Sequence, residues 1–256
     1  MTHQQDRRHF LSRLLAGAGA IVLTGCDKLS QSEVFTKVLS TGESLSRTAH
    51  HLIRSRKVMA QEFSEADMSP SFRSNGTSIP NSAEYLALSK NDFVDWALEI
   101  GGLVEKPLKL TLAQIQQLPS RTQITRHDCV EGWSAIAKWT GAPLHEVLSL
   151  VRPLPQARYV MFYCADPMEG DGTKKYYESI DMEDAYHAQT ILAYKLNGAT
   201  LPIKNGAPIR LRVERQLGYK QAKYLMRIEL VESFEHIAGG NGGYWEDEGY
   251  EWYAGI

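Results

Sequence analysis

The chain of 256 residues is long enough to bury a sizeable core, so it fits one large domain or one domain with appendages. Hydrophobic residues make up 43% of it and charged residues 23%, which excludes a wholly disordered or collagen-like protein. The formal net charge is only −2, so counterion release does not favour nucleic acid, and we expect no nucleic-acid partner.

Residues 1–26 have the pattern of an export signal. Arg7 and Arg8 precede a short apolar run at residues 14–23 that is rich in alanine and glycine. The run is too short to span a bilayer comfortably, and paired arginines stand where the positive region of a signal belongs. We therefore expect a twin-arginine signal and a periplasmic location, in preference to a transmembrane helix or a basic first helix of a cytoplasmic protein. Because this route exports folded proteins, a buried cofactor is also expected.

The end of the apolar run, Leu23-Thr24-Gly25-Cys26, resembles a lipobox, in which the cysteine receives a lipid anchor. Asp27 follows, and an aspartate there resembles the signal that keeps a bacterial lipoprotein at the inner membrane. Two expectations follow: a lipid anchor at Cys26 facing the periplasm, or a plain cleaved signal. Cys129 and Cys164 then remain, which are too few for a disulfide framework.

Residues 27–80 are expected to form a helical N-terminal arm and a linker. Apolar residues at spacings of three, four and seven predict a helix over residues 32–63. Proline, asparagine and glycine predict a loop over residues 69–82. The boundary of the main domain, residues 81–256, is therefore placed near residue 80.

The main domain mixes strands with helices. Alternation and β-branched content predict strands at residues 96–100, 108–111, 121–126, 159–164, 209–213 and 224–231. Helices are predicted at residues 112–118, 143–151 and 182–188. The aromatic end of the chain is expected to pack back onto the domain. This mixture predicts an α+β fold with a folded-up sheet at its centre.

Cys129 lies at the end of a predicted strand and beside the turn at Gly132, a location typical of functional sites. A thiolate is a good ligand for a soft metal, and the neighbouring Arg126 and His127 are expected to favour the charged form. The residues alone leave three alternatives: a buried structural cysteine, a nucleophile with His127 or His187 as its base, and a zinc ligand. Zinc is disfavoured because no CxxC or HxxxH spacing occurs.

A second candidate feature is the segment NGAPIRL, which starts at Asn205. Asn205-Gly206 predicts a tight turn from which Arg210 emerges on the next strand. Such a turn cradles an anion, and arginine and lysine side chains grip phosphate. The alternative is that the basic residues between 210 and 223 line an exposed strand and turn. We favour binding for Arg210 and Lys223.

Four segments together resemble the molybdopterin domain of the sulfite oxidase superfamily. They are HDCVEGWS at 127–134, KWTGAPL at 138–144, YHAQTILAYKLNGATLP at 186–202 and NGAPIRLRVERQLGYKQAK at 205–223. The resemblance extends over nearly all of residues 85–253, and the order and spacing of four segments make it specific. It implies a sulfite-oxidase-type fold of mixed sheets with flanking helices, and an oxidoreductase that carries a molybdenum-molybdopterin cofactor.

The resemblance also implies roles for individual residues. Cys129 corresponds to the cysteine that supplies the protein's thiolate to molybdenum, and is therefore the implied catalytic residue. The implied cofactor-binding residues are Asn91, Cys129, Cys164, Asn205, Arg210, Gln221, Ala222 and Lys223. Cys164 stands where relatives have threonine or serine, although a small hydrophobic residue at a strand end is an equal reading. Asn91 corresponds to an entrance-loop asparagine, or is an ordinary turn residue.

Within the superfamily, the chain resembles the periplasmic methionine sulfoxide reductase catalytic subunit, which works with a haem-bearing membrane partner. The chain has no CxxCH, so we expect a separate haem-bearing electron-transfer protein. Full sulfite oxidases carry a further dimerisation domain, whereas this sequence stops soon after Trp252, so a monomer is expected. The expected reaction is reduction of an S-oxide or N-oxide. The alternatives are sulfite oxidation with electrons passed to a cytochrome, a non-enzymatic binding lipoprotein, and a cysteine-dependent hydrolase.

Overall fold

The computed structural model describes residues 32, 41–42, 45, 48, 58–169 and 172–256. The chain divides into two compact units, Met1–Ser55 and Arg56–Ile256. In the first unit the described residues 41, 42, 45 and 48 are helical. The predicted export signal and Cys26 lie outside the described residues. Within the described part of the chain, no helix is long and apolar enough to cross a membrane.

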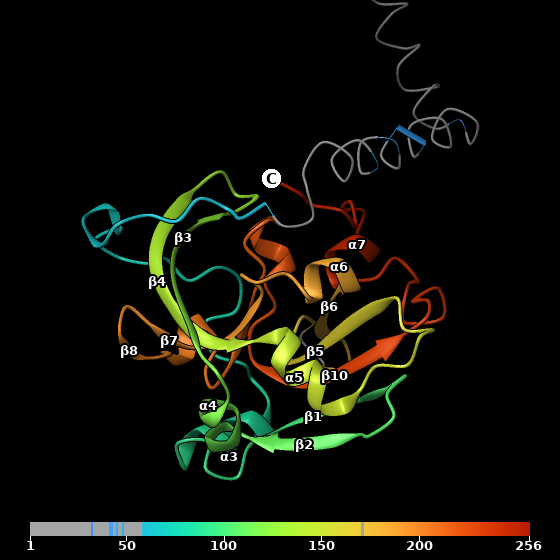
Figure 1. Cartoon of the computed structure of the whole chain (residues 1–256), viewed down its shortest axis with the longest axis horizontal. Coiled ribbons are helices and arrows are strands. Elements are labelled where there is room, and N and C mark those ends of the chain that lie inside the picture. Colours follow the sequence, from blue (N-terminus) through green and yellow to red (C-terminus); the bar gives the residue numbers. More distant parts are fainter. Residues whose placement is uncertain (1–31, 33–40, 43–44, 46–47, 49–57, 170–171) are drawn as a thin grey trace, which may run out of the picture. The chain divides into compact units, whose positions relative to one another are not determined.

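The second unit contains two sheets (Figure 1). The first sheet has the strand order β2-β1-β10-β5-β6. Its strands are β1 (Ala97–Gly102), β2 (Leu108–Thr111), β5 (Tyr159–Pro167), β6 (Lys175–Asp181) and β10 (Leu225–Val231). The pair β1 and β10 is parallel, and the other pairs are antiparallel. Most of β5 is buried on both faces, which places this strand in the core of the domain.

The second sheet runs β3-β4-β7-β8, with β9 paired to β7. Its strands are β3 (Arg121–Asp128), β4 (Ser134–Pro143), β7 (Ile191–Leu196), β8 (Ala199–Thr200) and β9 (Arg210–Arg212). β3 and β4 form one long antiparallel hairpin, whose last pair is Asp128 with Ser134 (Figure 1). Cys129 therefore stands at the tip of this hairpin, and Arg210 begins the short strand on the far side of β7.

Short helices flank the sheets. They are α3 (Ala83–Lys90), α4 (Leu112–Gln117), α5 (Leu144–Val151), α6 (Met182–Ala185) and α7 (Tyr244–Asp247), with 3-10 turns at Glu65–Asp67, Ile203–Asn205 and Gly218–Lys220. Thr111 and Gln114 form a capping box that starts α4, and the helix stops just before Pro119. α5 buries four apolar side chains in the core, including Leu144 and Leu148. The predicted α+β fold is confirmed.

The predicted helix over residues 32–63 is wrong at its C-terminal end. Residues 58–63 are not helical: the Phe63 N–H donates to Ile124 O at 2.9 Å, and Glu62 forms a bridge with Thr125. β3 is an edge strand, so its unpaired backbone groups are available to this segment, and tertiary pairing overrides the helical spacing. Residues 58–80, which we call the strap, continue from this edge towards the site described below.

The aromatic end of the chain packs back onto the domain, as predicted. The Leu217 N–H donates to Ala254 O at 2.9 Å, and Trp252 Nε1 donates to Ser179 Oγ at 2.8 Å. These contacts hold the last residues of the chain against the η3 turn (Gly218–Lys220) and β6. Side chains from α7 and the following residues are thereby brought close to the hairpin tip that carries Cys129.

Candidate functional site

The turn between β3 and β4 presents Cys129. The Cys129 N–H donates to Trp133 O at 2.9 Å, and the Gly132 N–H donates to Cys129 O at 3.0 Å. Gly132 has a φ of 84°, a left-handed conformation that glycine adopts without steric cost. These bonds close a tight turn and leave the Cys129 side chain half-buried. The thiol is thus held in place while one side of it remains accessible.

Cys129 lines a pocket with about 740 Å³ of empty space, its open mouth included, which is a size usual for small-molecule sites. The wall combines five parts of the chain: the strap, the hairpin tip, the ends of β5 and β6, the η3 turn with the residues after it, and the C-terminal segment. Its residues are Asn75, Gly76, Thr77, Cys129, Val130, Glu131, Asp166, Met168, Tyr176, Gly218, Tyr219, Gln221, Lys223, Trp245 and Tyr250. The pocket thus unites three residues predicted for the site: Cys129, Gln221 and Lys223.

Arg210 lies behind this wall and is fully buried. Its Nη1 donates to Asn205 O and its Nη2 donates to Gln221 O, each at 3.0 Å, while its Nε has no partner. No carboxylate in the described part of the chain forms an ion pair with it. Burial, and then the neighbouring Arg212, lower the pKa of Arg210 to about 9. A buried cation without a counter-ion is costly, so this position is suited to an anionic ligand.

Lys223 is the second cation of the site. Its Nζ donates to Asn75 O and, at 2.6 Å, to Thr77 O, so the strap is tied to the pocket wall. Burial, and then Arg210, lower the pKa of Lys223 to about 7. Burial likewise raises the pKa of Asp166 to about 6, with Lys223 opposing that rise. The site therefore contains groups whose charge depends strongly on what occupies it.

Asn205 ends the 3-10 turn Ile203–Asn205, and Gly206 follows in a left-handed conformation with a φ of 113°. A Cβ at Gly206 would lie 3.1 Å from the Cβ atoms of both Arg210 and Lys223, so the turn brings the backbone close to both cations. Asn205 is buried, and its Nδ2 has no partner. The predicted turn is present, and it places Asn205 beside Arg210.

The structure does not bring Asn91 to the pocket. Asn91 caps the C-terminal end of α3, is exposed, and donates from Nδ2 to Asp95 Oδ2 at 2.5 Å. The asparagine that does line the pocket is Asn75, whose Oδ1 is buried without a partner. From the sequence, Asn75 is predicted only to lie in the loop at residues 69–82. The available signal was the Asn75-Gly76 pair, which marks a sharp turn but does not indicate where the loop travels.

Cys164 and Ala222 are both buried and do not line the pocket. Cys164 is a free cysteine, as is Cys129, so no disulfide joins the two. Burial, and then Asp166, raise the pKa of the Cys164 thiol well above its usual value. Ala222 O accepts a hydrogen bond from the Leu211 N–H at 2.8 Å, which fixes the chain between Gln221 and Lys223. Both residues therefore support the wall from behind.

The expected activation of Cys129 by Arg126 and His127 is wrong. Arg126 is exposed and pairs with Asp128 at 2.9 Å. His127 is fully buried, and burial followed by Arg212 lowers its pKa, so the ring is neutral. Burial raises the pKa of Cys129. The thiol is thus not a preformed thiolate, and coordination to a metal is the event that would deprotonate it.

The alternatives for Cys129 are also weakened by the geometry. Neither His127 nor His187 is hydrogen-bonded to Cys129 in the described part of the chain. His187 Nε2 lies 3.1 Å from Val58 O and its Nδ1 accepts from the Gln189 N–H at 3.2 Å, so this histidine is engaged away from the pocket. Among the described residues, no three or more histidine, cysteine, aspartate or glutamate side chains are grouped to hold a metal ion. Among the described residues, Cys129 therefore has neither the histidine base that a nucleophile needs nor the further ligands that a zinc site needs.

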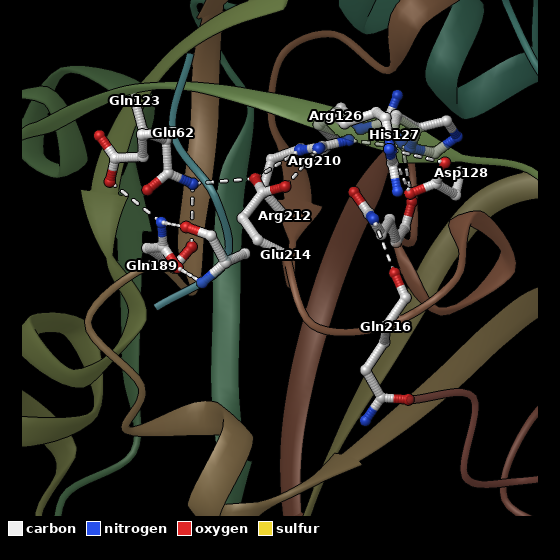
Figure 2. A network of polar contacts seen from close by, with 12 residues as sticks. Glu62, Gln123, Arg126, His127, Asp128, Gln189, Arg210, Arg212, Glu214 and Gln216 are labelled. Carbon is white, nitrogen blue, oxygen red and sulfur yellow. Dashed lines mark hydrogen bonds and ion pairs between the residues drawn. The ribbon is translucent and has the colours of Figure 1, made fainter. Parts of the chain in front are cut away.

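A buried polar network backs the hairpin (Figure 2). Gln123 donates from Nε2 to Gln189 O and to Glu214 Oε1 at 3.0 and 2.9 Å. Glu214 forms a two-pronged pair with Arg212, at 2.9 and 2.6 Å. Arg212 Nη1 then lies 2.9 Å from His127 Nδ1. The network therefore runs beneath β3 and ends two residues before Cys129.

Residues 85–236 match the family model described as an oxidoreductase molybdopterin binding domain. This match covers more than half of the chain and includes the hairpin tip, both arginines of β9 and Lys223. The chain belongs to the sulfite oxidase superfamily. It is accordingly an oxidoreductase of the molybdopterin-binding kind, which confirms the resemblance read from the four sequence segments.

Individual relatives agree with this assignment. YedZ1 of Azospira oryzae, whose name proposes a protein-methionine-sulfoxide reductase subunit, is 35% identical over 249 residues, 97% of this chain and 87% of that protein. The protein-methionine-sulfoxide reductase catalytic subunit MsrP of Xanthomonas axonopodis pv. citri is 35% identical over 245 residues, 91% of this chain and 72% of that protein. The sulfane dehydrogenase SoxCD of Paracoccus pantotrophus shares the fold, with a TM-score of 0.50 and 24% identity over 55% of this chain and 39% of that chain.

The residues of the pocket fit a molybdopterin group. Two buried cations, Arg210 and Lys223, have no ion-pair partner among the described residues, and a pterin phosphate would supply the missing anion. The buried atoms Asn75 Oδ1, Asn205 Nδ2 and Gln221 Oε1 have no partners in the protein. Buried polar groups are rarely left unpaired, so a polar ligand is expected to satisfy them. Cys129 stands on the same wall with an accessible thiol suited to a soft metal.

Proposed function

We propose that the chain reduces a sulfoxide, with a molybdenum-molybdopterin cofactor held between Cys129 and the cations Arg210 and Lys223. The observation that carries this proposal is the placement of an accessible thiol and buried, unpaired cations around one pocket. When bound, the cofactor supplies two-electron oxo-transfer chemistry. The net reaction converts a sulfoxide, two electrons and two protons into a thioether and water.

Each residue has a defined part in holding the cofactor. Cys129 provides the thiolate ligand of the metal. Arg210 and Lys223 neutralise the phosphate, and Asn205 and Gln221 bind polar atoms beside it. We add Asn75, from the strap, to this set. Cys164 and Ala222 support the wall without lining the pocket.

The pocket wall favours a neutral substrate over sulfite. Aromatic side chains form part of it: the rings of Trp245 and Tyr250 stack at 5.3 Å, and those of Tyr219 and Tyr250 meet edge to face at 5.3 Å. Sulfur groups pack well against such rings. The charged side chains of the wall are Glu131, Asp166 and Lys223, so there is no excess of positive charge to attract an anion.

Two further cations that could attract sulfite, Arg126 and Lys174, are engaged elsewhere. Arg126 pairs with Asp128, and Lys174 pairs with Glu169 at 2.8 Å; neither of these two side chains lines the pocket. The names of the relatives, which specify protein-bound methionine sulfoxide, support a substrate of the same class. We therefore favour a methionine sulfoxide or a similar neutral sulfoxide.

Electrons must come from another protein, because the chain has no haem-attachment motif. We propose a haem-bearing membrane partner as the donor, and a periplasmic location reached through the twin-arginine signal. Lipidation of Cys26 would hold the protein near such a partner. Mass spectrometry of the exported protein tests the anchor directly, since a mature chain that begins after Cys26 would exclude it.

Analysis of the holoprotein, exported through its own signal, tests the whole proposal. We expect stoichiometric molybdenum and pterin, sulfur ligation of the metal in X-ray absorption spectra, and oxidation of a reduced viologen by methionine sulfoxide. Cys129→Ser should abolish turnover, while the buried Cys164→Ser should lower it by less than about tenfold. Protein that lacks molybdenum, or that responds only in a sulfite-dependent assay of cytochrome reduction, would sink the proposal.

A further inference from the structure

His127 lies on β3, two residues before Cys129, and its side chain is 0% exposed. The rings of Phe72 and Trp133 enclose it, with centroids 5.5 and 5.4 Å away. The function proposed above gives this histidine no task. A buried imidazole is nevertheless a strong hydrogen-bonding group, so both of its nitrogen atoms need partners.

The first nitrogen has a partner that defines the state of the ring. His127 Nδ1 lies 2.9 Å from Arg212 Nη1. A guanidinium can only donate, so Nδ1 must accept and carries no proton. The single proton of the neutral ring is therefore on Nε2. The hydrogen bond with Arg212 thus makes Nε2 a donor (Figure 2).

Arg212 cannot easily turn away from this contact. Both its Nε and Nη2 are bonded to Glu214, and its guanidinium lies 4.4 Å from the centroid of the Trp139 ring. Glu214 is in turn held by Gln123 at 2.9 Å. All four of these side chains are buried. The network is therefore rigid, and it fixes both the tautomer and the orientation of His127.

The second nitrogen points at the pocket wall. His127 Nε2 is buried and has no hydrogen-bond partner in the protein. A Cβ at Gly218 would lie 2.6 Å from it, so Nε2 approaches the backbone of a residue that lines the pocket. Burial lowers the pKa of His127 and the side chain of Gln221 opposes this, so Gln221, a residue of that wall whose own Oε1 is buried and unpaired, lies next to the ring. Both unpaired atoms therefore lie at the wall of the pocket that contains Cys129.

We propose that His127 is a positioning residue for the cofactor, and that its Nε2–H donates a hydrogen bond to an acceptor atom of the pterin group bound beside Cys129. This inference rests on the proposed function. It adds to the cofactor site a residue of β3, which is distant in the sequence from Arg210 on β9. It also gives the Gln123–Glu214–Arg212 network a role, which is to hold the Nε2–H donor of His127 in one direction.

Two substitutions distinguish the roles of the two ring nitrogen atoms of His127. His127→Asn keeps an oxygen near the position of Nδ1, which can accept from Arg212, but removes the donor. His127→Gln places an amide donor near the position of Nε2. The control is Arg126→Gln, on the same strand but exposed and paired with its neighbour Asp128. The measurements are pterin content per folded protein, the rate of pterin release during dialysis, and the melting temperature.

We expect His127→Asn to release pterin about three- to tenfold faster than the wild type, the effect of one lost hydrogen bond. His127→Gln should recover a large part of that loss, and Arg126→Gln should match the wild type. A purely structural role would lower the melting temperature of both histidine variants without changing release from the folded protein. Equal release by the wild type and His127→Asn, or no recovery in His127→Gln, would overturn the inference.

A measurement on the wild type keeps the test independent of variant folding. In protein labelled with ¹⁵N-histidine, NMR should show His127 as the Nε2–H tautomer, with its proton resonance shifted between the cofactor-free and loaded forms. The Nδ1–H tautomer, or an unchanged resonance, would contradict the inference. Wild-type protein without molybdenum and pterin would overturn the proposed function as well, whereas loaded protein with an indifferent His127 would overturn this inference alone.

Discussion

Arg210 and Arg212 lie two residues apart on β9 and are both fully buried against the ring of Trp139, at 5.2 and 4.4 Å from its centroid. Within the described part of the chain, only Arg212 has a carboxylate partner, Glu214. One arginine is therefore already neutralised by the protein, whereas the other has no carboxylate partner and is available for the ligand that we propose. The two should respond to substitution in opposite ways.

Arg212→Met should destabilise the cofactor-free protein strongly, because it leaves Glu214 buried without a cation. Breaking such a pair costs about 3–5 kcal/mol. Arg210→Met removes a charge that has no ion-pair partner, so its cost in unfolding free energy should be smaller by at least about 2 kcal/mol. Urea denaturation of the cofactor-free variants measures both values. Equal destabilisation would mean that Arg210 is a structural cation, contrary to its proposed role.

Lys220 joins the pocket wall to the C-terminal segment. Its Nζ lies 2.5 Å from both Glu178 Oε1 and Glu246 Oε1, and all three side chains are 0% exposed. Lys220→Met would leave two buried glutamate side chains without their cation and should cost about 3–5 kcal/mol of unfolding free energy. The exposed pair Lys174–Glu169 offers the control, since Lys174→Met should cost at most about 1 kcal/mol.

The same Lys220→Met substitution should also loosen α7, which carries Glu246 and the pocket residue Trp245. Tryptophan fluorescence and protection of α7 amides from hydrogen exchange report this change. Unaltered protection in α7 would show that the helix is held by its aromatic contacts rather than by the ion pairs.

Anion binding at Lys223 should weaken as pH rises. Burial lowers the pKa of Lys223 to about 7, so the cation is present below that pH and is lost above it. Burial raises the pKa of Asp166 to about 6, so this residue becomes negatively charged as the pH rises through that value. The new negative charge also weakens anion binding. Calorimetric titration of cofactor-free protein with sulfate, whose charge is constant, should show affinity falling by up to about tenfold per pH unit above pH 7.

Lys223→Arg provides the matched control for this titration, because an arginine here keeps its charge to a higher pH than the lysine does. Below pH 8, where Arg210 is still charged, only the step near pH 6 from Asp166 should remain in that variant. An affinity for sulfate that does not change between pH 6 and pH 8 in the wild type would show that Lys223 does not contribute its charge to the site.

Substitutions of Asn75, in the strap, and Asn91, after α3, test which of the two asparagines contributes to cofactor binding. Asn75→Ala should lower the pterin content of purified protein, because Asn75 lines the pocket and has a buried, unpaired oxygen. Asn91→Ala should leave pterin content unchanged, since Asn91 is exposed and bonded to Asp95. The reverse result would restore the role that sequence resemblance gave to Asn91. Both variants should fold, as neither side chain is part of the core.

Local sequence patterns predicted several of the strands, because alternation and β-branched content are visible along the chain. The strand at residues 108–111 matches β2, and those at 159–164 and 224–231 match most of β5 and β10. β4, β6, β7 and α3 were not predicted. β4 contains Ala135, Lys138 and Gly141, which carry little intrinsic strand preference, so its pairing with β3 and β7 decides its conformation.

The sequence by itself determined the family, the cysteine at the hairpin tip and the basic segment after β9, because these features lie in contiguous motifs whose spacing is visible along the chain. Only the tertiary structure decided that Asn75 enters the pocket, that Arg210 is unpaired while Arg212 is neutralised, and that His127 presents a donor. The physical reason is that these properties arise from contacts between distant residues. The Phe63 N–H bonded to Ile124 O, which sets the path of the strap, joins positions that no local pattern connects.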